Sequence, residues 1–226
     1  MNQPSQPGDP AAYSYYDMRM VVGVIATALP FALAVGNMVF GLLGPAGVLP
    51  HPIFQPSISA YYYTDLRNVL VGSLCAIAVF NICSVGYDLQ DKIAGQLSGV
   101  FALGVAFFPT TNPAENDPSP MEQHIGTVHL IFASLMFLTL AYFCLVLFTR
   151  TAPGRTPTPR KRQRNIVYLV CGWTIVGSIV VMVSLNIAAI KTLLQCIDPL
   201  FCFETVSIIA FGVAWLTKGK AILRDL

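Results

Sequence analysis

Charged side chains are scarce in this sequence. Only 11% of its 226 residues are Asp, Glu, Lys or Arg, and 55% are hydrophobic, whereas soluble domains usually carry about 25% charged residues. The mean hydropathy is +0.65, and long apolar stretches contain no charge that would mark a solvent-facing side. This composition excludes an ordinary soluble domain and predicts an integral membrane protein.

Familiar catalytic and ion-binding motifs are also missing. There is no HExxH sequence and no paired-carboxylate motif, and the loop "TTNPAENDPSPMEQ" lacks the alternating oxygen ligands of an EF-hand. The net charge is only +2, so the sequence gives no reason to expect a nucleic-acid partner. Whether the protein is an enzyme stays open on these grounds.

Six apolar runs are interpreted as membrane spans. They cover residues 20–43, 69–85, 93–108, 130–148, 166–190 and 200–216. The predicted fold class is therefore all-α, a polytopic bundle of six transmembrane helices. The polar, proline-rich leader at residues 1–19 is expected to be disordered, residues 20–216 form the membrane domain, and residues 217–226 form a short basic tail.

Basic residues are distributed unevenly between the two sides of this bundle. Of the 13 Lys and Arg residues, 11 fall on the side of the termini, and only Arg67 and Lys191 fall on the other. Basic loops stay in the cytoplasm, so both termini are predicted to be cytoplasmic in a multi-pass protein of the cell membrane. The basic segment 149–165 is expected to be a mobile loop that contacts anionic lipid headgroups.

Hydroxyl groups gather immediately before the second span, in "PSISAYYYTDLRN". This stretch, residues 56–68, is called the hydroxyl-rich segment below. Thr64 or Asp65 is expected to cap the following helix, and the tyrosines to anchor the membrane interface. Other polar residues are predicted to reach the same depth and to form an outer pocket with it. The predicted pocket residues are Ser57, Ser59, Tyr61, Asp65, Arg67, Asn37, Asn186 and Glu204.

Glu204, about one turn inside the last span, has two interpretations. It is either a polar lock between helices, or a proton carrier, metal ligand or general base on the floor of a pocket. Its candidate partners are His129, Arg67 and the hydroxyl groups. A pocket indicates binding or transport of a lipid headgroup or small amphiphile, whereas a lock is typical of a noncatalytic partner subunit. Both interpretations remain open.

The three histidines, His51, His124 and His129, all fall at the predicted outer boundary. Three imidazoles and a water would form an open zinc site, which would suit a zinc-dependent membrane hydrolase of a lipid amide or ester. However, His124 and His129 are separated by about 140° on an ideal helix, so they do not share a helix face. Histidines that hydrogen-bond to the backbone at the interface are the alternative. No cofactor is established.

Two further patterns concern packing. Cys196 and Cys202 flank the outer turn "CIDPLFC", where an oxidising compartment permits a disulfide, and free thiols are the alternative. Gly95 and Gly99 have the small-xxx-small spacing that allows two helix backbones to approach closely.

Four blocks, "SISAYYYTDLRNVLVG", "GYD", "GVAFFPT" and "ETVSIIAFGVAWLTKG", resemble those of a family of uncharacterised bacterial six-span membrane proteins. This resemblance covers residues 57–219 and implies a fold but no activity. Ser57 or Ser59, together with Asp65 and the three histidines, also resembles the zinc-site residues of the CREST-type membrane hydrolases, which include alkaline ceramidases. The chain lacks that family's HxxxH pair and seventh helix. The second resemblance implies a zinc held by His51, His124 and His129.

Overall fold

The computed structural model describes residues 10–43, 54–84, 88–151, 156–194, 198–219 and 221–223. Every regular element in these ranges is helical, which confirms the predicted all-α class. The elements are α1 (Pro10–Leu43), η2 (Ser59–Tyr63), α2 (Arg67–Cys83), α3 (Leu89–Phe107), α4 (Pro120–Tyr142), η3 (Phe143–Leu147), α5 (Pro159–Ser184), α6 (Ala188–Leu194) and α7 (Pro199–Lys218). Of the two short elements, η2 is a 3-10 turn and η3 is a π-helical turn that continues α4.

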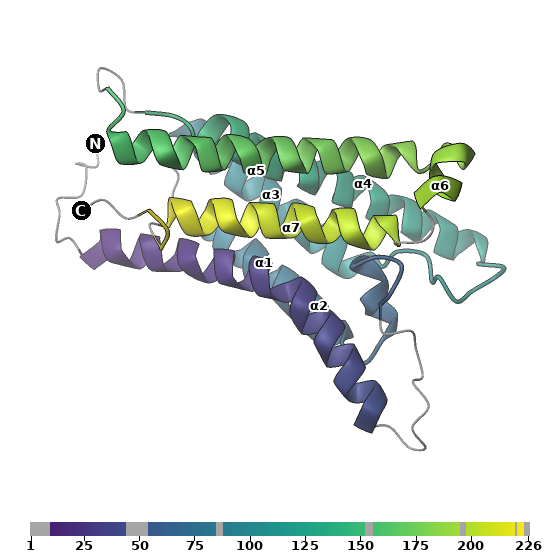
Figure 1. Ribbon diagram of the computed structural model, residues 1–226. Helices are drawn as coiled ribbons and strands as arrows, with labels where there is room; N and C mark the ends of the chain where they lie inside the picture. The colour runs from purple at the N-terminus through teal and green to yellow at the C-terminus, as the bar shows by residue number, and fades with distance from the viewer. Residues whose placement is uncertain are drawn as a thin grey trace.

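The long helices lie side by side and alternate in direction (Figure 1). α1, α3 and α5 begin at one end of the bundle, which also contains the end of α7 with Lys218. This end is called the basic end. α2, α4 and α7 begin at the opposite end, where the hydroxyl-rich segment lies, and this is called the hydroxyl end. α1 bends in its middle, where Pro30 lies inside the helix and removes a backbone hydrogen bond.

Among the described residues, four helical stretches are long and apolar enough to cross a membrane. They are Asp17–Leu43, Pro120–Leu147, Pro159–Ser184 and Pro199–Lys218. α2 is apolar but has only 17 residues, and α3 contains Asp91 and Lys92 near its start. Crossing by all six long helices therefore stays a prediction.

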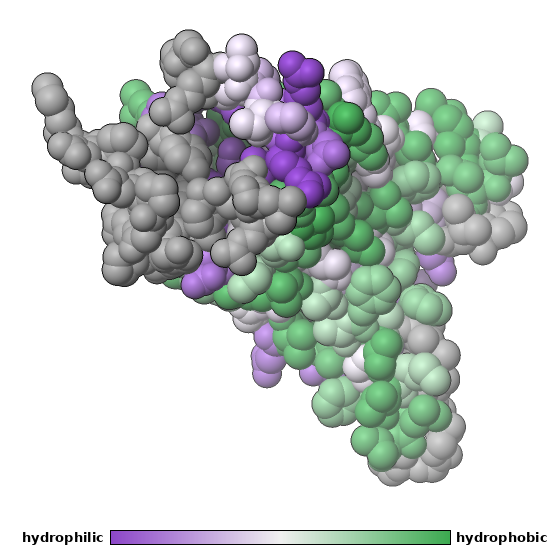
Figure 2. All heavy atoms as spheres, turned by 60° about the vertical axis from the view of Figure 1, so that its left-hand side comes forward, coloured by the Kyte–Doolittle hydropathy of each residue, from purple (hydrophilic) through white to green (hydrophobic). Residues whose placement is uncertain are grey.

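Large apolar side chains cover the outside of these helices. Leu130 of α4 is 64% exposed and Trp173 of α5 is 63% exposed. Figure 2 shows apolar surface along the sides of the bundle, with hydrophilic residues gathered where the basic end comes forward. Soluble monomers rarely expose contiguous apolar surface on this scale, so the surface is compatible with a lipid environment.

All six long helices begin before their predicted spans, and two of them begin inside segments predicted to be a disordered leader and a mobile loop. α1 starts at Pro10, so residues 10–19 of the expected disordered leader are helical. α5 starts at Pro159, so the predicted loop over 149–165 is wrong for its last seven residues. Proline fits the first turn of a helix because its missing N–H would have no partner there. In addition, the Thr158 hydroxyl caps α5 by accepting from the Lys161 N–H at 3.1 Å.

The close approach predicted at Gly95 and Gly99 is confirmed. A Cβ atom on Gly95 would lie 2.9 Å from the carbonyl oxygen of Asn81, and one on Gly99 would lie 2.7 Å from that of Ala78. α3 therefore packs directly on the backbone of α2. Between these helices the buried Asn81 donates from Nδ2 to Ser98 Oγ at 3.0 Å. The pair forms a wall that reaches both ends of the bundle.

Candidate functional site

Glu204 connects α7 to the hydroxyl-rich segment. It lies in the second turn of α7, is only 8% exposed, and its Oε2 accepts the backbone N–H of Ile58 at 2.6 Å. The Ser59 backbone is a second donor to the same carboxyl. One turn earlier, the Phe201 N–H donates to the carbonyl of Pro56 at 3.1 Å. Glu204 therefore binds the backbone of this segment, and the prediction of a hydroxyl, His129 or Arg67 as its partner is wrong in the described structure.

The hydroxyl groups of the segment satisfy its own backbone. Ser57 Oγ accepts the Ala60 N–H at 3.0 Å, while Thr64 Oγ1 donates to the Tyr61 carbonyl at 2.9 Å and accepts the Leu66 N–H at 3.2 Å. Such local bonds compete with helix formation. α2 consequently begins only at Arg67, and its N-cap Leu66 makes no side-chain cap bond. The predicted cap by Thr64 or Asp65 is wrong, because Thr64 is already engaged in the preceding turn.

The three consecutive tyrosines have different environments. Tyr61 is 0% exposed, its ring lies 6.3 Å from that of Phe201, and burial raises the pKa of its phenol. Tyr61 is therefore part of the core and not of an interfacial belt. Tyr63 is half-buried and donates to the Thr110 carbonyl at 2.6 Å. Tyr62 is also half-buried, and the Arg67 guanidinium stacks 4.1 Å above its ring and donates to its hydroxyl.

A narrow crevice opens beside Tyr62, between the hydroxyl-rich segment and helices α2, α3 and α4. Its polar lining is Ser59, Tyr62 and His129, and its apolar lining is Leu70, Val71, Leu74, Val105, Ala106 and Pro109. It has room for roughly one water-sized group. A mostly apolar wall with a few convergent polar groups is typical of small-molecule sites. The crevice is therefore the candidate site at the hydroxyl end.

Only part of the predicted pocket comes together there. Ser57, Tyr61 and Glu204 are all buried, and Glu204 binds the backbone next to Ser59, which lines the crevice. Asp65 and Arg67 are exposed. Two further predicted residues are placed elsewhere: Asn37 is buried in α1, and Asn186 is exposed after α5, where its Nδ2 donates to the Val183 carbonyl at 2.9 Å.

Sequence reasoning did not assign Tyr62 to a pocket, and it named His129 only as a metal ligand and as a partner for Glu204. Tyr62 was interpreted only as an interfacial anchor, and its position follows from the 3-10 turn that the local hydroxyl bonds produce. His129 was considered for a metal. Its Nδ1 lies 2.6 Å from the Phe108 carbonyl, which is the backbone-bonded alternative. Neither placement is visible in sequence spacing.

The predicted zinc site is only partly described. α4 begins at Pro120 behind a capping box of Ser119 and Glu122, so His124 and His129 lie on one helix. His124 is exposed and His129 is buried, which confirms that they do not share a face. His51 lies outside the described residues, and within the described ranges no three His, Cys, Asp or Glu residues are grouped to hold a metal. The three-histidine site stays a prediction.

The predicted disulfide falls on the turn before α7. Cys202 is half-buried in the first turn of α7, and its N–H donates to the Asp198 carbonyl at 3.1 Å. Cys196 lies outside the described residues. The pairing of these two cysteines therefore stays a prediction.

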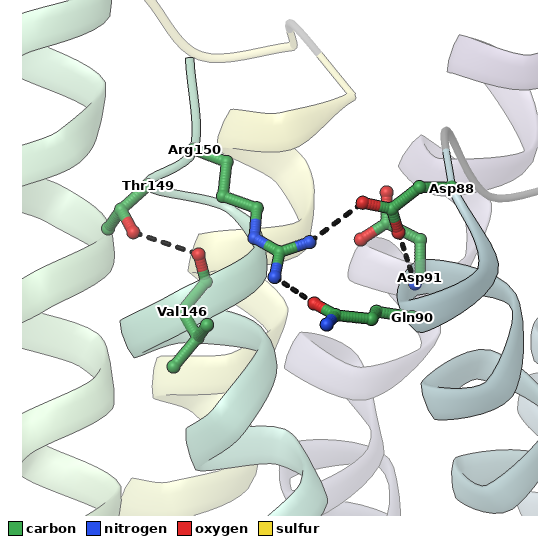
Figure 3. A network of polar contacts seen from close by, with 6 residues as sticks. All are labelled: Asp88, Gln90, Asp91, Val146, Thr149 and Arg150. Carbon is green, nitrogen blue, oxygen red and sulfur yellow. Dashed lines mark hydrogen bonds and ion pairs between the residues drawn. The ribbon is translucent and has the colours of Figure 1, made fainter. Parts of the chain in front are cut away.

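The basic end is braced by polar contacts between helix termini (Figure 3). Arg150, just after η3, contacts Asp88 at 2.9 Å and also Gln90 at the start of α3. Both ionic partners are partly exposed, so we expect the pair to contribute less than about 1 kcal/mol to the free energy of unfolding. Its position nevertheless holds the start of α3 next to the end of η3.

Two residues of the predicted headgroup-contacting loop turn inward instead. The Lys161 ammonium donates to the Phe148 carbonyl at 2.6 Å. The buried Arg164 donates to the Leu223 carbonyl at 3.1 Å. Because these residues lie on α5, the helix directs them toward the bundle, whereas Arg162 between them is exposed.

Comparisons with known proteins do not assign the chain to a family: no family model, no curated protein and no solved structure matches it. Over the part of the chain that the structure describes, the fold is an all-helical bundle with four helices suited to a bilayer. The two family resemblances stay predictions.

Proposed function

We propose that this chain is a multi-pass protein of the cell membrane, with all six long helices crossing the bilayer and the basic end facing the cytoplasm. Charge asymmetry supports this orientation. The described Lys and Arg residues at the basic end are Arg19, Lys92, Arg150, Arg160, Lys161, Arg162, Arg164 and Lys218. At the hydroxyl end they are Arg67 and Lys191. Positive loops remain on the cytoplasmic side, which places the hydroxyl end outside.

The protein binds or transports a lipid headgroup or small amphiphile in the crevice at the hydroxyl end. The observation that carries this proposal is the crevice lining, where Ser59, Tyr62 and His129 meet an apolar wall from α2 and α3. The polar groups suit a headgroup or hydroxyl, and the apolar wall suits a hydrocarbon chain. In the proposed orientation, the crevice lies where the outer leaflet places both parts of such a molecule.

Two neighbouring tyrosines have different roles in this proposal. Tyr61 and the Glu204 contact keep the wall of the crevice fixed. Tyr62 is half-exposed, and its contact with Arg67 is at the surface, where a cation–π pair contributes only about 0.5–1 kcal/mol. A ligand larger than the crevice enters by displacing the Tyr62 ring, because moving Tyr61 would disrupt the core.

Filling the crevice tests the proposal. Val71→Trp places a bulky ring at its apolar wall, so we expect retention of bound outer-leaflet lipid to fall by about tenfold or more, equivalent to roughly 1.4 kcal/mol. Native mass spectrometry of protein released from nanodiscs measures this retention. The matched control is Val79→Trp on the same helix, where Val79 is 55% exposed. Equal lipid retention by wild type and both folded variants would contradict the proposal.

A further inference from the structure

A second cavity lies at the basic end, on the opposite side of the bundle from the crevice. Its lining comes from α1, α2, α3, η3 and α7. The lining residues are Arg19, Asn81, Ser84, Asp91, Gly95, Phe143, Leu147, Phe148, Trp215 and Lys218. The enclosed part has room for roughly one or two water molecules. Arg19 is buried and Lys218 half-buried, so two cationic side chains from different helices meet at a partly desolvated cavity.

Several cationic side chains interact with one another around this cavity. The charges of Arg19, Lys161 and Arg164 all act on the Lys218 ammonium. The Lys161 ammonium bonds to the Phe148 carbonyl, and the Lys218 ammonium lies 5.2 Å from the centre of the Phe148 ring. Lys161 and Lys218 therefore both lie at the end of η3.

Acidic side chains also lie at this end of the bundle. Asp91 lines the cavity and its charge also acts on Lys218. Asp88, at the start of α3, is engaged by Arg150. An anion bound in the cavity would lower the cost of holding several cations close together away from water.

Trp215 supplies a neutral donor at the same cavity. It is 4% exposed, and its indole N–H is buried without an acceptor in the described structure. The ring is held by Phe143, Phe148 and Phe211, with centroid distances of 5.2, 4.9 and 5.0 Å respectively. An indole nitrogen can only donate, so an acceptor such as a water or a phosphate oxygen would satisfy this fixed group.

Asn81 can adapt to either a water or an anion. Its Nδ2 donates to Ser98 Oγ, while its Oδ1 is buried without a donor. Turning the amide by 180° would let Oδ1 accept from the Ser98 hydroxyl and would free Nδ2 to donate to another acceptor. Because Asn81 lines the cavity, a water or an anion bound there is a candidate acceptor.

We propose that the cavity at the basic end binds a phosphate group, with Arg19 and Lys218 supplying charge and Trp215 a directed hydrogen bond. Guanidinium, ammonium and indole donors together recognise phosphate oxygens through charge-assisted bonds. The phosphate belongs to the headgroup of an inner-leaflet lipid or is free inorganic phosphate. The lipid source rests on the proposed membrane orientation, but phosphate binding itself does not. This site is separate from the crevice at the hydroxyl end.

Binding is measured on delipidated full-length protein in detergent, by titrating inorganic phosphate against thermal stability at constant ionic strength. We expect Lys218→Gln to weaken binding about tenfold through loss of a charge-assisted bond. Trp215→Phe keeps the aromatic packing but removes the indole N–H, so we expect it to weaken phosphate binding about fivefold. Arg162→Gln is the matched control, because it removes an exposed charge at the same end. Val71→Trp, at the other end, should bind phosphate normally.

A second arm identifies the source of the phosphate. Native mass spectrometry compares retention of phosphatidic acid and phosphatidylcholine from nanodiscs that contain both lipids. Selective retention of phosphatidic acid, reduced by Lys218→Gln and Trp215→Phe but not by Arg162→Gln, supports a lipid ligand. Saturable binding of inorganic phosphate with the same dependence on these variants, without selective lipid retention, supports a free phosphate ligand. If the folded variants bind both probes like wild type, or phosphate acts no differently from chloride, the proposal is overturned.

Discussion

Glu204→Ala is expected to lower the free energy of unfolding by about 3 kcal/mol. The substitution leaves the Ile58 N–H, now 2.6 Å from the carboxyl oxygen, without an acceptor in a buried position. It also creates a cavity against the hydroxyl-rich segment, which carries the buried Tyr61. Equilibrium unfolding in mixed micelles measures the loss. Glu115→Ala is the control because Glu115 is exposed, and it should change stability by less than about 0.5 kcal/mol.

Glu204→Gln separates an anchoring role from proton chemistry. Glutamine keeps an acceptor oxygen for the Ile58 N–H, so it should restore much of the stability lost in the alanine variant. Hydrogen exchange should show fast exchange at Ile58 and Ser59 in Glu204→Ala and slow exchange in the wild type. If Glu204→Ala were as stable as wild type but lost lipid retention, Glu204 would act on the ligand and not on the backbone.

Gly99→Ala is expected to destabilise the bundle by about 2 kcal/mol despite the better helix propensity of alanine. The added Cβ would lie 2.7 Å from the carbonyl oxygen of Ala78, so the backbones of α2 and α3 must separate. That movement would also strain the buried Asn81–Ser98 bond. Thermal unfolding in detergent measures the effect.

Gly72→Ala is the matched control for this packing claim. Gly72 lies on α2, and a Cβ there meets no atom within 4 Å, so the substitution should be neutral or stabilising by up to about 1 kcal/mol. Equal effects of the two substitutions would contradict the direct contact between α2 and α3.

The long apolar runs predicted the helices, because hydrophobic length and missing charge depend only on the sequence. Their ends were less predictable. Pro159 was taken as part of a loop, although proline after a capping Thr158 begins α5. This shift moved Lys161 and Arg164 from a presumed surface loop to the inside of the basic end. Gly95 and Gly99 were interpreted correctly because their spacing reports directly on backbone approach.

The candidate sites were less accessible to sequence reasoning. The depth of Glu204 indicated that it needs a partner, but the partner is a backbone N–H, and every residue except proline has one. The same holds for His129, which bonds to the Phe108 carbonyl. Trp215 and Arg19 are far apart in sequence and meet only because α1 and α7 pack together. Their cavity therefore required the tertiary structure.

The orientation of the bundle is tested most directly by cysteine accessibility in intact cells. Asp65→Cys and Arg162→Cys place single probes at exposed positions of the hydroxyl end and the basic end, and the wild-type protein gives the background labelling. A membrane-impermeant maleimide should label position 65 in intact cells and position 162 only after permeabilisation. Labelling of position 162 in intact cells, with position 65 protected, would contradict the proposed orientation and remove the crevice from the outer leaflet.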